Sequence, residues 1–350
     1  MIGNFSVRKL IVCLGVFIVL IPSVRADELR ALPDDNLNYP VLFLSAPVDG
    51  KRNTGSGFYY HKDNAIYFVT ARHVLFFESS VALKELPSNL KIPYNLIYRM
   101  QYDLKSKKLS FSGIMSEGDK AKLIRNSQKE SLFAKAVEQL YKKSQTLRLK
   151  NEAASLFSYP KDRSQGESNE IEIQLRKLLN DGRIKYHPNS DVTVVKIGAL
   201  ITTETGKQII RLEDGVRIVK GTGITGIDAA TNVKPFNEVL EGNAVFVFGY
   251  PTSISNNNAF LDIKLPLLRK GIVAGKNERL NTIILDCPIY QGTSGGLVVE
   301  VDEKFPKKYF KGIGLITNFV PFRNEGSQEA QNSGYSVAVP IDLVSELLRD

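Results

Sequence analysis

Short runs of β-branched and aromatic residues, broken by Gly, Pro and Asn, constrain the fold of this 350-residue chain more than any other feature. Runs of this kind are typical of short strands joined by turns. One group lies between about residues 39 and 112. A second group follows residue 191, at 192–197, 244–248, 271–274, 282–285, 297–300, 311–317 and 335–339. This pattern predicts an all-β architecture.

The stretch between the two groups has a different texture. From residue 117 to about 180, apolar residues recur at helical spacing among Lys, Glu and Gln. The segment 341–348 resembles a C-terminal helix. We therefore expect two β-barrels with a helical insertion, 113–182, in the first. The predicted domains are 27–200, which includes the insertion, and 201–350.

The N-terminus has the pattern of a signal peptide. Arg8 and Lys9 precede an apolar stretch at 10–20, Pro22 breaks that stretch, and 24–26 has the small-x-small pattern of a cleavage site. We expect 1–26 to be removed, leaving an exported, periplasmic or secreted protein. An uncleaved membrane anchor is the alternative, but 10–24 is shorter than the ~20 apolar residues that a spanning helix needs. Cleavage would remove Cys13, so Cys287 would remain as a lone thiol.

Charge and composition exclude several classes of function. The net charge is +9, but the basic residues concentrate in 104–185, with 18 Lys and Arg against 10 Asp and Glu. This local excess argues against a protein built to bind nucleic acid. We expect a solvated helical hairpin there, and the alternative is a surface for an envelope or protein partner. Two cysteines and three histidines leave little material for a metal cluster, so we expect neither metal nor cofactor.

The string Gly-Thr-Ser-Gly-Gly at 292–296 is the first sign of chemistry. A serine between glycines can expose its hydroxyl on a tight turn, with backbone N–H groups nearby, as acyl transfer requires. The string also fits the nucleophile elbow of α/β-hydrolases. That fold places its histidine after the serine, whereas no histidine follows His187 here, so we reject it.

The general base must then be His61, His73 or His187. His73 ends an apolar stretch, whereas His61 lies in a polar turn and His187 precedes a proline in a loop. Asp191 stands at the head of an apolar strand, where a carboxylate can be buried against an imidazole. Taken alone, each of these residues is more often structural than catalytic.

Together these stretches resemble the trypsin-like serine peptidases, and most closely their HtrA/Deg branch. The matching segments are 55–58, 70–74, 191–196, 249–251, 271–273, 286–296 and 336–340. The resemblance implies two six-stranded antiparallel barrels. It also implies Ser294 as nucleophile, His73 as general base and Asp191 as the group that orients His73. The N–H groups of Gly292 and Ser294 would form the oxyanion hole, and Thr317 matches the residue that closes the triad.

Several features depart from that family. The insertion separates His73 and Asp191 by 118 residues, and Arg72 stands where a small residue is commoner. Thr293 replaces the aspartate that pairs with a freed N-terminus in pancreatic-type enzymes, so we do not expect that activation. The chain ends about ten residues after Pro340, and we expect no PDZ domain.

Pro288, Ile316, Thr317 and Val337 are the expected pocket residues. Pro288 stands where an acid would select basic P1 side chains, so we do not expect trypsin-like cleavage. Ile316 and Val337 at the same pocket indicate small or medium apolar P1 groups. A second glycine pattern, 221–226, fits the dinucleotide-binding fingerprint, but no amphipathic helix follows it, so we expect a glycine-rich hairpin.

The sequence thus predicts a secreted or periplasmic serine endopeptidase that cleaves polypeptides through an acyl-enzyme. The alternative is a catalytically silent module of the same fold that binds peptides or acts as an envelope scaffold.

Overall fold

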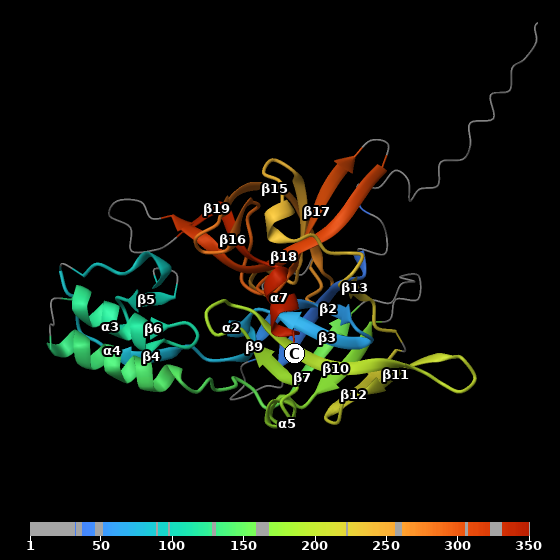
Figure 1. The fold of residues 1–350 in the computed structure, drawn as a ribbon, viewed down its shortest axis with the longest axis horizontal. Coiled ribbons are helices and arrows are strands. Elements are labelled where there is room, and N and C mark those ends of the chain that lie inside the picture. The colour runs from blue at the N-terminus through green and yellow to red at the C-terminus, as the bar shows by residue number, and fades with distance from the viewer. Residues whose placement is uncertain are drawn as a thin grey trace, which may run out of the picture.

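The computed structural model describes residues 32, 37–45, 52–88, 90–96, 99–127, 131–158, 168–221, 223–255, 261–304, 307–322 and 331–349. The predicted signal peptide, 1–26, lies outside these residues. The described chain forms two β units and a smaller module beside them (Figure 1). No helix among these residues is both long and apolar enough to cross a membrane.

The first unit is a ten-stranded sheet. Its main path runs β11-β10-β3-β2-β1-β7-β8-β12, while β9 pairs with β10 and β13 pairs with β2. The strands are β1 (Pro40–Ser45), β2 (Thr54–Lys62), β3 (Ala65–Thr70), β7 (Ala154–Ser158), β8 (Asn169–Ile173), β9 (Ile184–Tyr186), β10 (Thr193–Thr202), β11 (Gln208–Leu212), β12 (Val216–Lys220) and β13 (Gly226–Asp228). Residues 213–215 alone join β11 to β12, the two ends of the path, so the sheet curls around its core.

The second unit is a closed six-stranded barrel in the order β14-β15-β16-β19-β18-β17. Its strands are β14 (Ala244–Gly249), β15 (Leu267–Asn277), β16 (Thr282–Asp286), β17 (Leu297–Lys304), β18 (Lys307–Phe322) and β19 (Gln331–Pro340). Apolar side chains of both units pack into one shared cluster, which includes Phe58, Val69, Phe246 and Leu315. This cluster fixes the second barrel against the first sheet.

Short helices connect and cover the two units. They are α2 (Arg72–Leu75), α5 (Leu175–Asn180), η4 (Phe236–Glu238), α6 (Thr252–Ser255) and α7 (Asp342–Leu347). Leu343 and Val344 of α7 are buried in the shared cluster. The hydroxyl groups of Tyr60 and Ser345 lie 2.9 Å apart, which ties α7 to β2.

The smaller module, residues 79–144, packs around a hydrophobic core of its own. It contains β4 (Ser79–Ala82), η2 (Tyr94–Leu96), β5 (Met100–Asp103), β6 (Lys108–Phe111), α3 (Glu117–Asn126) and α4 (Ser131–Ser144). α4 buries Phe133, Ala136, Val137 and Leu140, whose spacing puts them on one helical face. This amphipathic face packs against the three-stranded sheet β4-β6-β5.

The predicted fold class is confirmed, but its details differ. The second barrel closes with six strands as expected, whereas the first unit is a curled sheet of ten strands. The predicted boundary at 200/201 falls inside β10, and the first sheet continues through β13. The predicted helical insertion 113–182 also contains β7 and β8, and in β8 buried and less buried side chains alternate with the period of a strand. The helical spacing of apolar residues at 117–144 was extended too far along the chain, so the strands that follow were not predicted.

Candidate active site

His73 and Asp191 meet because of how two strands pair. β3 and β10 are antiparallel, with Thr70 opposite Thr193. His73 follows β3 by three residues and Asp191 precedes β10 by two, so both lie at the same edge of the sheet. His73 Nδ1 lies 2.6 Å from Asp191 Oδ2, and the His73 backbone N–H donates to Asp191 Oδ1 at 2.9 Å. The carboxylate therefore holds both the ring and the backbone of His73.

The charges of this pair stabilise each other. Burial by itself lowers the pKa of His73, but the charge and hydrogen bond of Asp191 outweigh burial and raise that pKa above its ordinary value. Burial by itself raises the pKa of Asp191, but the charge and hydrogen bonds of His73, with the charge of Arg72, outweigh it and hold the pKa at about 2. Asp191 is thus ionised at neutral pH and His73 is a stronger base than a free imidazole.

Ser294 lies on the loop that precedes β17, and this loop packs across the boundary between the two units. The Ser56 N–H of β2 donates to the Ser294 carbonyl at 2.8 Å. The next residue, Gly295, packs so closely that a Cβ there would lie 2.9 Å from the Ala71 nitrogen. The Ser294 backbone thus lies against the segment that leads into His73. In the described part of the chain, no hydrogen bond joins the Ser294 hydroxyl to His73.

Two backbone N–H groups of the loop around Ser294 have no hydrogen-bond partner among the described residues. They are the N–H groups of Gly292 and of Ser294 itself. Gly292 has φ +99°, and a Cβ there would lie 2.7 Å from the Thr252 nitrogen, so the position requires glycine. Backbone N–H groups without a partner next to a serine are a feature that an oxyanion-binding site requires.

Ser56 fixes this loop, a role that the sequence interpretation missed. Its hydroxyl donates to the Gly292 carbonyl at 2.7 Å and accepts from the Tyr250 N–H at 2.9 Å. Ser56 is fully buried. A serine between two glycines in a strand was a visible signal, but only the fold reveals its partners in the second barrel.

The four predicted pocket residues all lie in or directly beside strands of the second barrel. Thr317 donates through its hydroxyl to the Val337 carbonyl at 3.3 Å, so this pair is adjacent. Ile316 is fully buried in the core of the second barrel, and Pro288 is half-buried. Thr317 was expected to close the triad, but its hydroxyl bonds Val337 and not Asp191. A register shift in the pairing of β18 with β19 lies between Ile316 and Asn318, at Thr317.

The other two histidines have structural surroundings. His61 lies half-buried in β2 and not in a solvated turn as its neighbours suggested, and burial lowers its pKa. His187 Nδ1 accepts hydrogen bonds from the N–H groups of Asn189 at 3.2 Å and Ser190 at 2.9 Å. It therefore stabilises the turn that leads into Asp191. Among the described residues, no group of three His, Cys, Asp or Glu side chains could hold a metal ion.

The arrangement of His187 predicts a pH-dependent contribution to stability. Its pKa lies below 6.5, chiefly because burial disfavours the cation, with repulsion from Arg72 and Arg99 against attraction from Glu346. The unfolded state therefore binds this proton at higher pH than the folded state, so the stabilisation is complete above pH 6.5 and is lost as the pH falls. Between about pH 7.5 and about pH 5, we expect the urea midpoint to fall more steeply in the wild type than in His187→Asn. Equal slopes would contradict this role.

Comparisons with known proteins give structural matches only. No family model and no curated protein matches the chain. The solved HtrA-type protease AlgW with tripeptide is 10% identical, with a TM-score of 0.40 over 89% of this chain and 58% of that one. A serine endoprotease from Yersinia pestis is 15% identical, with a TM-score of 0.39 over 90% of this chain and 64% of that one. This chain thus spans about three fifths of the length of those structures. The fold class that the resemblance implied is borne out by the strand topology of this chain itself.

Proposed function

We propose that this protein is an exported serine endopeptidase with Ser294 as nucleophile, His73 as general base and Asp191 as the group that orients His73. The observation that carries the proposal is the 2.6 Å contact between His73 Nδ1 and Asp191 Oδ2. It leaves Nε2 of His73 as the nitrogen that faces away from the carboxylate. A neutral imidazole held in this way accepts a proton at Nε2.

The reaction would run in two halves. In the first, His73 Nε2 takes the hydroxyl proton while Ser294 Oγ attacks the scissile carbonyl carbon. The N–H groups of Gly292 and Ser294 would bind the oxyanion, and the imidazolium would protonate the leaving amine as the peptide bond breaks. In the second half, water attacks the acyl-enzyme, with His73 again accepting and then returning a proton. The acid product and the free Ser294 hydroxyl result.

We propose that the substrates are polypeptides with small or medium apolar P1 side chains. Pro288 carries no charge that would select a basic side chain, and Thr317 and Val337 are adjacent at the expected pocket. The position of Thr293 supports activation through loop arrangement, since no aspartate stands there to pair with a new N-terminus.

Labelling with a fluorophosphonate probe tests this function. The wild type should be labelled, and Ser294→Ala should lose labelling completely because the nucleophilic oxygen is gone. Ser80→Ala, a serine of β4 in the smaller module, is the matched control and should be labelled like the wild type. The intact mass of the labelled protein reports whether 1–26 has been removed. Labelling that survives Ser294→Ala would refute the assignment.

A silent peptide-binding module is the second candidate, and one observation favours it. In the described structure the Ser294 hydroxyl makes no hydrogen bond to His73. Catalytic hydrogen bonds are often long in a free enzyme and tighten with substrate, so the observation also fits a resting peptidase. Peptide binding without probe labelling under any condition would favour the silent module.

A further inference from the structure

The turn that leads into Asp191, residues 187–190, is held from outside by two arginines. Arg72, directly before His73, is 3% exposed. Its Nη1 donates to the carbonyls of His187 at 2.5 Å, Ser190 at 2.7 Å and Pro188 at 3.3 Å. A planar guanidinium offers several donors in a fixed geometry, so it sets the relative positions of these three carbonyls.

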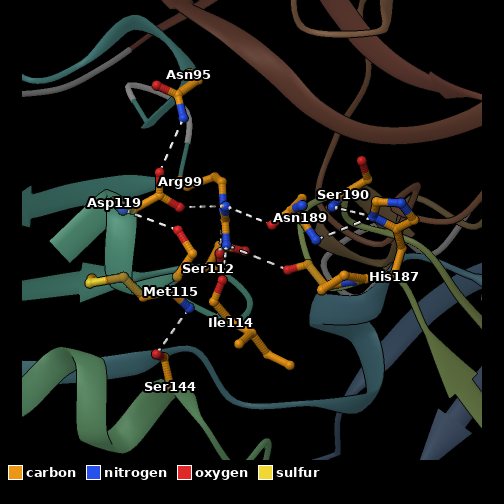
Figure 2. Close-up of polar contacts among 12 residues, drawn as sticks. Asn95, Arg99, Ser112, Ile114, Met115, Asp119, Ser144, His187, Asn189 and Ser190 are labelled. Carbon is orange, nitrogen blue, oxygen red and sulfur yellow. Dashed lines mark hydrogen bonds and ion pairs between the residues drawn. The ribbon is translucent and has the colours of Figure 1, made fainter. Parts of the chain in front are cut away.

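The second arginine, Arg99, belongs to the smaller module. Figure 2 shows its guanidinium between the module on one side and the turn on the other. On the module side it donates to the carbonyls of Ser112 at 3.1 Å and Ile114 at 2.5 Å. On the turn side it donates to Asn189 Oδ1 at 3.1 Å and to the Pro188 carbonyl at 3.4 Å. Arg99 therefore links the two parts of the protein directly.

The module also holds Arg99 rigidly. Its guanidinium lies 4.5 Å from the centre of the Phe111 ring, and Asp119 Oδ2 lies 3.8 Å from Nη1. Two further contacts join the same surfaces, since Arg72 Nη2 donates to Ser112 Oγ at 3.0 Å and the Ile114 N–H donates to the Pro188 carbonyl at 3.2 Å. Burial, followed by the charge of Arg72, lowers the pKa of Arg99 to about 10. Two neighbouring guanidinium groups are thus stabilised here by carbonyl acceptors from both sides.

We propose that Arg99 is a positioning residue for Asp191, so that the His73–Asp191 pair depends on docking of the module 79–144 against the turn 187–190. Asp191 is joined to that turn on one side and to β10 on the other. Loss of the Arg99 contacts leaves Arg72 as the main support of the turn, so the turn loosens and the carboxylate is held less firmly beside His73. The expected effect of Arg99 on activity rests on the proposed function. The expected effect on the His73–Asp191 pair does not, because the pair can be measured in a protein without activity.

The test is an NMR titration of the His73 ring, combined with the rate of fluorophosphonate labelling, in full-length wild type, Arg99→Ala and Arg125→Ala. Arg125 is an exposed arginine of α3 in the same module and serves as the control. The other charged groups that face His73, Lys150 and Glu78, are the same in all three proteins. Arg99→Ala should lower the His73 pKa and slow labelling about tenfold, whereas Arg125→Ala should change neither.

The second variant, Asn189→Ala, removes one exposed acceptor of Arg99 and should shift both readouts in the same direction by a smaller amount. It decides the question if Arg99→Ala does not fold. Arg99→Lys should not restore the wild-type values, because an ammonium cannot span both surfaces as the guanidinium does. If the wild type is never labelled, the proposed function fails while the titration still tests the positioning role. An unchanged His73 pKa in folded Arg99→Ala, or in Asn189→Ala where Arg99→Ala does not fold, overturns the proposal.

Discussion

Asp191→Asn is expected to slow labelling of Ser294 by about 10⁴-fold, the loss seen when a triad carboxylate becomes an amide in a trypsin-like enzyme. The asparagine can still contact His73 Nδ1, but it cannot fix the tautomer that leaves Nε2 free, nor stabilise an imidazolium. Labelling rates should be measured from about pH 5 to about pH 9, a range that spans the His73 titration. They give both the size of the loss in Asp191→Asn and its cause.

The pH profile separates this mechanism from simple misfolding. Activity needs neutral His73, and Asp191 raises the His73 pKa, so the wild-type rate should rise with pH through a midpoint above 6.5. In Asp191→Asn that midpoint should move to lower pH, because the negative charge is gone. Asp214→Asn removes an exposed carboxylate that pairs with Lys177 and should leave both rate and midpoint unchanged. A fully active Asp191→Asn would exclude a triad.

Gly292→Ala should slow labelling by about 10²- to 10³-fold, the cost of losing one oxyanion donor. The alanine Cβ would press against the Tyr250 carbonyl and lie 2.7 Å from the Thr252 nitrogen, so the peptide that carries the Gly292 N–H must rotate. Labelling kinetics and thermal unfolding should be measured together, because a non-glycine residue at φ +99° also costs stability.

Gly242→Ala is the matched control for that variant. Gly242 has φ +86° in the same unit, but a Cβ there would meet no atom within 4 Å. Both variants therefore share the backbone strain, and only Gly292→Ala adds the clash beside Ser294. Gly242→Ala should lose some thermal stability and keep the wild-type labelling rate. Equal labelling by the two variants would show that the Gly292 N–H is not used.

The pairing of His73 with Asp191 could be predicted because strand signals frame both residues. Apolar runs end just before His73 and begin just after Asp191, and a pair of antiparallel strands brings such ends together. The α/β-hydrolase fold was excluded because all three histidines precede Ser294 in the chain. The closed second barrel follows from the same kind of signal, since each of its strands contains one of the predicted runs.

The docking of the smaller module could not be predicted in the same way. Arg72 and Arg99 act mainly through backbone carbonyls, and every residue has a carbonyl, so no pattern of side chains marks their partners. In the sequence, Arg72 was noted only because a small residue is commoner at that position in the trypsin-like peptidases. The segments of β4, β5 and β6 were expected to belong to the first barrel, but they form a separate three-stranded sheet. The local pattern of residues predicts a strand and does not tell which sheet that strand joins.

The pocket was the least predictable part of the site. The Thr317 hydroxyl donates to the Val337 carbonyl beside a register shift in β18, and the sequence around Thr317 does not indicate such a shift. Ile316 was predicted to line the pocket, and in the structure it is fully buried among the apolar side chains of the second barrel.

The hydroxyl of Ser56, which bonds Gly292 and Tyr250, has a consequence for biosynthesis. Ser56 comes from the part of the chain that is synthesised earlier, and both of its partners come from the part that is synthesised later. The loop around Ser294 thus obtains its shape only after translation has passed it and the two β units have docked. On the function proposed here, a chain whose two β units have not yet docked would lack the hydrogen bonds that hold the loop of its nucleophile.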